Sequence, residues 1–121
     1  MSKKILIIED DEAIANNLAV ALNGDYDIRL ASTAASGLAL AREKIPDLIL
    51  VDRQLPDMTG LEVLRQLKEE ESFREIPIVV LSDQTDPKTN SGVIAFGGKE
   101  CWSKVDLSLQ DMVSGIKALI D

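Results

Sequence analysis

The chain has 121 residues, 45% apolar and 28% charged, which is the composition of one ordinary globular domain. Its net charge of −8 argues against nucleic acid as a direct partner. The sequence contains no histidine, which excludes nucleophilic triads with a histidine base, histidine metal sites and a role as a phosphohistidine carrier.

The single cysteine, Cys101, excludes an internal disulfide framework and is typical of the reducing cytoplasm, where we expect the protein to be located. The first apolar run, residues 5–8, is too short for a signal peptide or a membrane span, so we expect no membrane contact. No linker, repeat or low-complexity segment interrupts the chain. We therefore predict a single domain over residues 1–121.

The first apolar run predicts a strand that is buried on both faces, as in a parallel sheet, and the four acidic residues 9–12 follow it directly. A helix comes next, with apolar residues four positions apart on one face: Ile14, Leu18 and Leu22. Gly24 and the residue before it predict its end. Residues 26–31 predict a second, less apolar strand at the edge of the sheet, because charged residues interrupt it.

Ser32 or Thr33 is expected to cap the second helix. Its predicted buried face consists of Ala34, Leu38 and Ala41. Pro46 closes the loop after this helix, and the aliphatic residues 48–51 then predict a third buried strand.

Asp52 follows the third strand at once, and Pro56 and Gly60 turn the chain toward a third helix. The apolar face expected for that helix is Leu61, Leu64 and Leu67. The charged residues 68–71 are interpreted as a solvated tail. Taken alone, Asp52 is equally well explained as a turn cap or as a functional acid at the carboxyl end of a parallel strand.

Residues 76–81 predict the fourth strand, which ends at Ser82. Asp86 is expected to cap a fourth helix, with proline at its first position. This helix, over residues 88–96, is predicted to be weak because it contains several poor helix formers, and two glycines end it.

Residues 100–103 predict a short fifth strand, followed by Lys104, and a last helix is expected from about residue 107 to residue 120. Its predicted buried face consists of Leu109, Met112, Ile116 and Leu119. Strands that alternate with helices predict an α/β fold, a parallel sheet with right-handed crossovers and helices on both faces.

In such a sheet the carboxyl ends of all strands lie along one edge. Polar residues stand at that edge after four of the five strands: Glu9, Asp10, Asp52, Ser82 and Lys104. Each of these residues, taken alone, is explained as a turn or cap residue, but together they favour a functional site.

Like charges at about 4 Å repel by about 4 kcal/mol per pair at an effective dielectric near 20, so the three carboxylates need a cation. Lys104 supplies one charge, and a divalent ion such as Mg²⁺ supplies two. Asp52 beside such cations is suited to accept a phosphoryl group, and Ser82 can donate a hydrogen bond to a phosphoryl oxygen.

With these residues in place, the chain resembles the receiver domain of two-component response regulators over nearly its whole length. The matching segments are residues 7–10, 47–52, 55–56, Gly60, residues 77–82 and Lys104. The resemblance implies a doubly wound, five-stranded parallel sheet of strand order 2-1-3-4-5 with five helices, as in flavodoxin-like folds.

The resemblance also implies phosphorelay signalling. Asp52 would accept a phosphoryl group from a histidine kinase or phosphotransfer protein, which would switch a surface around the fourth helix, fifth strand and fifth helix. That surface would bind a downstream effector protein or domain. Such a receiver takes part in its own phosphotransfer and dephosphorylation and is not a turnover enzyme.

The implied cofactor is Mg²⁺ or Mn²⁺. Its ligands would be Asp10, Asp52 and the backbone carbonyl of Gln54, with Glu9 acting through water. Ser82 and Lys104 would contact the phosphoryl group. Gln84, together with Gln54, would tune how long the acyl phosphate survives.

The sequence departs from the family pattern near the site. Asp83 replaces the usual small residue and can repel a phosphodonor, and Val105 replaces the proline that usually follows the lysine. Cys101 stands at the position of the aromatic switch residue, and Trp102 points to the other side of the strand. Arg53 is charged where the family is often apolar.

These departures motivate an alternative, a degenerate receiver that acts as a protein-interaction module with weak or no phosphorylation-driven switching. Its docking face would use the weak fourth helix and an exposed Trp102.

A flavodoxin-like cofactor protein and a haloacid dehalogenase-type phosphatase are further alternatives. The acidic loop at residues 9–12 disfavours the first, because a flavin phosphate needs a loop rich in glycine, serine or threonine. Gln54 disfavours the second, because it stands where such phosphatases carry a second acid.

Overall fold

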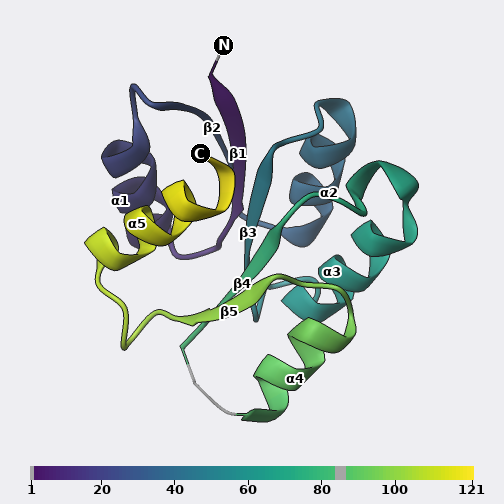
Figure 1. Cartoon of the computed structure of the whole chain (residues 1–121). Coiled ribbons are helices and arrows are strands. Elements are labelled where there is room, and N and C mark those ends of the chain that lie inside the picture. The colour runs from purple at the N-terminus through teal and green to yellow at the C-terminus, as the bar shows by residue number, and fades with distance from the viewer. Residues whose placement is uncertain (1, 84–86) are drawn as a thin grey trace.

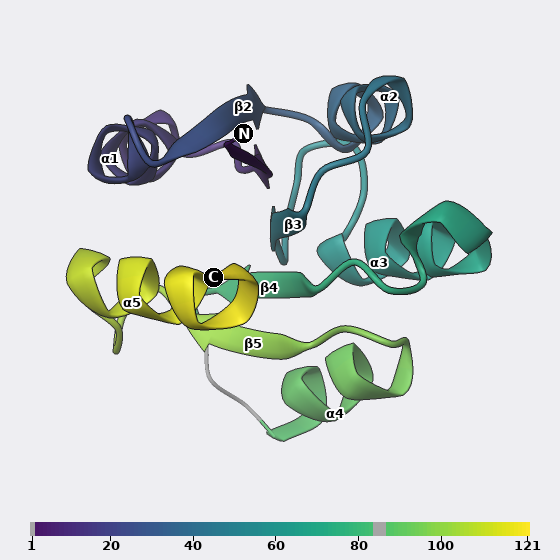
Figure 2. The same cartoon turned by 45° about the horizontal axis from the view of Figure 1, so that its top comes forward.

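Five parallel strands form one sheet in the part of the chain described by this computed structural model, residues 2–83 and 87–121. The strands are β1 (Lys3–Ile8), β2 (Tyr26–Ala31), β3 (Leu48–Asp52), β4 (Ile78–Ser82) and β5 (Glu100–Ser103). Their order is β2-β1-β3-β4-β5, with β2 at one edge (Figure 2). The predicted fold class, strand order and edge strand are confirmed.

Five α-helices connect the strands: α1 (Glu12–Leu22), α2 (Ala34–Glu43), α3 (Gly60–Glu69), α4 (Pro87–Ala95) and α5 (Leu109–Ile120). A short 3₁₀ turn, Glu71–Phe73, follows α3. Helices α1 and α5 cover one face of the sheet, and α2, α3 and α4 cover the other (Figure 1). None of the helices in the described ranges combines the length and apolar character needed to span a bilayer.

Local chemistry explains most helix ends. The hydroxyl of Thr33 accepts a hydrogen bond from the amide of Ser36, so Thr33 is the cap of α2. Ser108 and Asp111 form a capping box at the start of α5. Gly97 ends α4 with a φ of 91°, a conformation that favours glycine. The predicted cap Asp86 lies outside the described residues.

The aliphatic strands bury side chains on both faces of the sheet. Ile8, Val51 and Val80 align on the face covered by α2, α3 and α4. Their neighbours in sequence point into the second core, under α1 and α5. The strands are therefore packed on both faces up to their carboxyl ends, which is where the site is expected.

Trp102 is only 7% exposed and packs in the core under α1 and α5. The expectation that it forms an exposed docking face is wrong, although it does point to the opposite side from Cys101. Its ring lies so close to α5 that a Cβ on Gly115 would come within 2.8 Å of it. The indole nitrogen donates to a Glu100 carboxylate oxygen at 3.0 Å, which satisfies its one polar group.

The last helix is turned slightly from the expected orientation. Its buried stripe is Met112, Ile116 and Ile120. Leu109, predicted to be buried, is 41% exposed, because it begins the helix and borders only a shallow cavity.

Glu69 and Glu71 are exposed, as expected of a solvated tail, but Lys68 is not part of one. The ammonium nitrogen of Lys68 donates to the backbone carbonyls of Phe73, Arg74 and Ile76, at 3.0, 3.1 and 2.7 Å. The chain bends back after α3. The Phe73 carbonyl also accepts from the amide of Ile76, at 3.2 Å, so Lys68 is an added donor that brings the three carbonyls together. Lys68 is therefore a structural residue that joins the end of α3 to the start of β4.

Candidate functional site

The strand ladder continues past the strand ends and fixes the backbone of the site. The amide of Glu9 donates to the carbonyl of Ala31 at 2.9 Å. The amide of Lys104 donates to the carbonyl of Ser82 at 2.8 Å. The residues after β1 and β5 are thus held by backbone hydrogen bonds, which restricts where their side chains can point.

Three carboxylates meet at this edge of the sheet. Glu9, Asp10 and Asp52 each offer an oxygen atom, and these atoms lie within 4.8 Å of one another. Glu9 is 2% exposed and Asp52 is 6% exposed, whereas Asp10 is exposed. Lys104 reaches in from the end of β5, with its ammonium nitrogen 2.8 Å from Glu9 Oε2 and 3.0 Å from Asp52 Oδ1.

Burial dominates the electrostatics of the cluster. It raises the pKa of Glu9 to about 7, with a further increase from the charge of Asp52, although Lys104 and the amide of Asp11 oppose the rise. Burial also raises the pKa of Asp52. Burial would lower the pKa of Lys104, but its two carboxylate partners outweigh this and raise that pKa. The charged forms of Glu9 and Asp52 therefore cost free energy in the folded protein.

This donor set suits a hard divalent cation. Carboxylate oxygens are preferred ligands of Mg²⁺, and one lysine does not balance three carboxylates. Among the described residues, the buried oxygen Oε2 of Glu9 has no well-aligned hydrogen bond, although the Lys104 ammonium lies beside it. It can therefore accept a hydrogen bond from a metal-bound water.

The other residues that the sequence predicts for the site differ in how far they are buried. Ser82 is fully buried at the end of β4, and Gln54 is exposed in the loop between β3 and α3. Asp83 is exposed, and Cys101 is partly buried against the core under α2, α3 and α4. Gln84 lies outside the described residues.

The loop between β3 and α3 is pressed against the strand that carries Asp52. A Cβ on Gly60 would collide with the backbone carbonyl oxygen of Asp52, so only glycine fits here. The amide of Gly60 donates to the carbonyl of Arg53 at 2.7 Å, and Gln54 pairs with Thr59 in an isolated antiparallel bridge. The loop is thus a short hairpin that starts at Asp52.

Asp57, at the tip of this loop, caps a different helix. Its carboxylate oxygens accept hydrogen bonds from the amides of Ala34 and Ala35, at 2.8 and 3.0 Å. These two hydrogen bonds lower the pKa of Asp57. Sequence reasoning missed this contact, because the capping residue lies 23 positions from the helix start and no local pattern links them.

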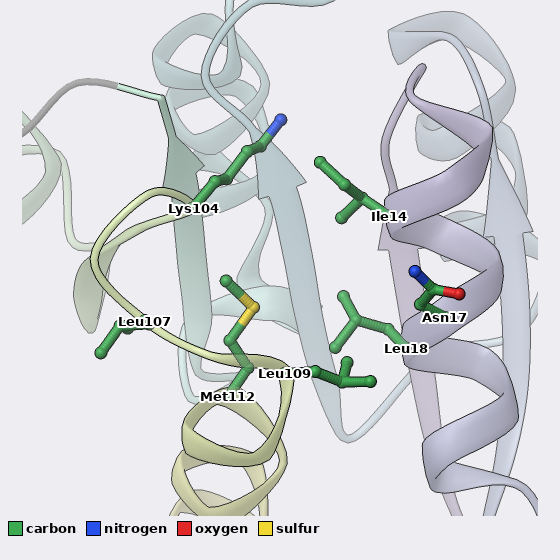
Figure 3. Close-up of a pocket in the computed structure, with 7 residues that line it drawn as sticks. All are labelled: Ile14, Asn17, Leu18, Lys104, Leu107, Leu109 and Met112. Atoms are coloured by element: carbon green, nitrogen blue, oxygen red, sulfur yellow. The ribbon is translucent and has the colours of Figure 1, made fainter.

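A cavity of about 130 Å³ lies beside the site, between α1 and the connection from β5 to α5. It is lined by Ile14, Asn17, Leu18, Lys104, Leu107, Leu109 and Met112. Figure 3 shows Ile14 and Leu18 on α1 facing Met112 of α5. The aliphatic stem of Lys104 borders this apolar wall while its ammonium group reaches the carboxylates.

The fold and site define a class of signalling domain, and sequence comparison agrees. Residues 5–117 match the model of the response regulator receiver domain. The chain is 32% identical over 121 residues to the polar-differentiation response regulator DivK of Brucella ovis, covering 99% of this chain and 98% of DivK. The chain belongs to the response regulator receiver domain family.

Other relatives are similar over different lengths. Identity to the DNA-binding response regulator MtrA of Mycolicibacterium smegmatis is 36% over 87 residues, which is 71% of this chain and 37% of MtrA. Receiver domains bind Mg²⁺ in an acidic pocket and interact with kinases and effectors.

Solved structures share the fold. The chemotaxis response regulator CheY4 of Vibrio cholerae has a TM-score of 0.91 at 22% identity, covering 98% of this chain and 99% of CheY4. A CheY-like receiver domain protein from Methanospirillum hungatei has a TM-score of 0.90 at 26% identity, covering 100% and 95%. The Mn²⁺-bound form of response regulator Rcp1 has a TM-score of 0.80 at 26% identity, covering 96% and 92%.

Proposed function

We propose that residues 1–121 form one receiver domain that accepts a phosphoryl group on Asp52 from the phosphohistidine of a histidine kinase or phosphotransfer protein. One observation carries the proposal: the buried Asp52 carboxylate lies 3.0 Å from the Lys104 ammonium, inside a cluster of three carboxylates. Family membership supports the same function.

The chemistry is an in-line displacement at phosphorus. A carboxylate oxygen of Asp52 attacks, the bond from phosphorus to the donor imidazole nitrogen breaks, and that nitrogen keeps the electron pair and takes up a proton. Lys104 then pairs with a phosphoryl oxygen, and the hydroxyl of Ser82 donates a hydrogen bond to another.

Asp10, Asp52 and the carbonyl of Gln54 would hold Mg²⁺ or Mn²⁺ directly, and Glu9 would hold it through water. The bound ion supplies positive charge against the carboxylates and the phosphoryl oxygens. The domain acts on its own acyl phosphate, whose loss to water Gln54 and Gln84 would tune, and turns over no separate substrate.

Intact mass measurement after incubation with acetyl phosphate and Mg²⁺ tests the acceptor. We expect one phosphoryl adduct on the wild-type protein and on the control Asp106→Asn, which removes an exposed acid between β5 and α5. Asp52→Asn should form no adduct. An unmodified wild-type protein, or an adduct that persists in Asp52→Asn, would overturn the proposal.

We further propose that phosphorylation shifts a surface around α4, β5 and α5 that binds a downstream effector. Apolar side chains are exposed along these elements, with Ile94 54% and Phe96 44% exposed. Such side chains are suited to contact a partner. Phosphorylation can act there only if the partner binds the two states with different affinity.

A second candidate, an interaction module without switching, is favoured by Cys101, which has no ring to rotate toward Ser82. Hydrogen exchange of α4 and β5, measured with and without Asp52 phosphorylation, separates the two candidates. Changed exchange supports the switch. Unchanged exchange in a fully phosphorylated protein supports the module.

A further inference from the structure

Hydrogen bonds hold the loop that starts at Asp52 both at its base and at its tip. At its base, the amide of Gly60 donates to the carbonyl of Arg53 at 2.7 Å. The amide of Leu55 donates to the carbonyl of Met58 at 3.1 Å, which closes the turn. At its tip, the carboxylate of Asp57 accepts hydrogen bonds from the amides of Ala34 and Ala35, in the first turn of α2.

Gln54 lies between the hydrogen bonds at the base of the loop and those at its tip. The hydrogen bonds of its bridge to Thr59 come from the residues on either side of it, so the peptide groups of Gln54 itself point away from Thr59. The Gln54 carbonyl is therefore left free by the bridge. Its position depends on how the whole loop is held.

The first turn of α2 holds that loop through its hydrogen bonds to Asp57. An α-helix leaves its first amides without partners inside the helix. Thr33 satisfies the amide of Ser36, at 3.1 Å, and Asp57 satisfies the two amides before it. A carboxylate is also favoured here by the helix dipole. Helix α2 in turn packs on β1 and β2, so this helix turn is part of the packed core.

We propose that Asp57 is a positioning residue for metal binding: it clamps the loop between β3 and α3 onto the first turn of α2 and so holds the Gln54 carbonyl where a divalent cation can use it. This inference rests on the proposed function. Mg²⁺ and Mn²⁺ demand near-octahedral ligand geometry, so a ligand on a looser loop lowers the affinity of the site.

Two variants separate this role from simple stabilisation of α2. Asp57→Ala removes the clamp, whereas Thr33→Ala removes the other cap of the same helix turn and leaves the loop untouched. Asp57→Asn keeps one acceptor oxygen and supplies a milder variant if Asp57→Ala folds poorly. Chemical denaturation of each variant shows how far the free energy of unfolding of the domain has fallen.

Titration with Mn²⁺, followed by the paramagnetic resonance signal of the free ion, measures the affinity. We expect Asp57→Ala to bind Mn²⁺ roughly tenfold more weakly than the wild type. This is the lower end of the range of affinity losses that follow when a group that orients a metal ligand is removed. Asp57→Asn should fall between it and the wild type, and Thr33→Ala should match the wild type.

Amide hydrogen exchange of the metal-free proteins supplies a second readout. The amides of Leu55 and Gly60 should exchange faster in Asp57→Ala and not in Thr33→Ala. Wild-type Mn²⁺ affinity in Asp57→Ala, or an equal loss in Thr33→Ala, would overturn the positioning role. A wild-type protein that binds no Mn²⁺, or an Asp52→Asn variant that binds it equally well, would instead refute the proposed site.

Discussion

The ammonium nitrogen of Lys104 lies 3.0 Å from Oδ1 of Asp52, although Lys104 follows β5, Asp52 ends β3, and β4 lies between these strands. This contact places one positive charge against the carboxylate that we propose as the acceptor. The same ammonium nitrogen also lies 2.8 Å from Oε2 of Glu9. Without a metal ion, the site therefore has a deficit of positive charge.

Asp52→Asn should stabilise the metal-free protein. Burial raises the pKa of Asp52, which means that its charge costs free energy in the folded state, and asparagine removes this charge at nearly constant volume. We expect the free energy of unfolding at neutral pH to rise by on the order of 1 kcal/mol, as for a partly compensated charge. Urea denaturation in the presence of a chelator measures it. A less stable variant would mean that the contact with Lys104 outweighs burial.

Mg²⁺ should stabilise the wild-type fold through Asp10. A ligand that binds only the folded state at a hundred times its Kd adds about 2.7 kcal/mol to the free energy of unfolding. Asp10→Asn should lose most of this gain, because an exposed ligand of the cluster is neutralised without disturbing the core. The matched control is Glu12→Gln, an exposed acid in the first turn of α1 that lies outside the cluster. Thermal melts with and without Mg²⁺ make the comparison, and an equal loss in both variants would contradict a specific site.

Tyr26→Phe should remove a stabilising contact that is sensitive to alkaline pH. The Tyr26 hydroxyl donates to Asp121 at 2.7 Å, and burial together with this hydrogen bond raises the Tyr26 pKa to about 12. A raised pKa means that the contribution is complete below the ordinary pKa of 10.0 and is lost as the pH rises toward about 12.

The difference in unfolding free energy between the wild type and Tyr26→Phe should be about 1 kcal/mol at neutral pH. It should shrink between about pH 10 and pH 12. Denaturation curves of the two proteins across this range provide the measurement. A difference that does not change with pH would show that the hydroxyl contributes only through packing.

Lys68→Met should destabilise the fold by about 1–3 kcal/mol, because it removes the ammonium donor from the partly buried carbonyls of Phe73 and Ile76, between α3 and β4. Methionine keeps most of the aliphatic stem, so the loss reports mainly the hydrogen bonds. Lys88→Met, at an exposed position of α4, is the matched control and should change stability little. Equal effects of the two substitutions in urea would contradict a specific role for the Lys68 ammonium.

The sequence by itself determined the sheet and the edge where the site lies. Residues 5–8 and 48–51 are continuous aliphatic runs, and such runs identify buried parallel strands without knowledge of their neighbours. Because parallel strands end along a common edge, the positions of Glu9, Asp52 and Lys104 in the sequence were enough to expect them together.

Only the tertiary structure decided the contacts between segments far apart in the chain. Whether Trp102 is buried depends on how closely α5 approaches β5, which Gly115 permits. Lys68 reaches its carbonyls because the chain bends back after α3. The cap that Asp57 places on α2 joins residues 23 positions apart. Local periodicity carries no information on such distances, because the packing of whole helices and strands sets them.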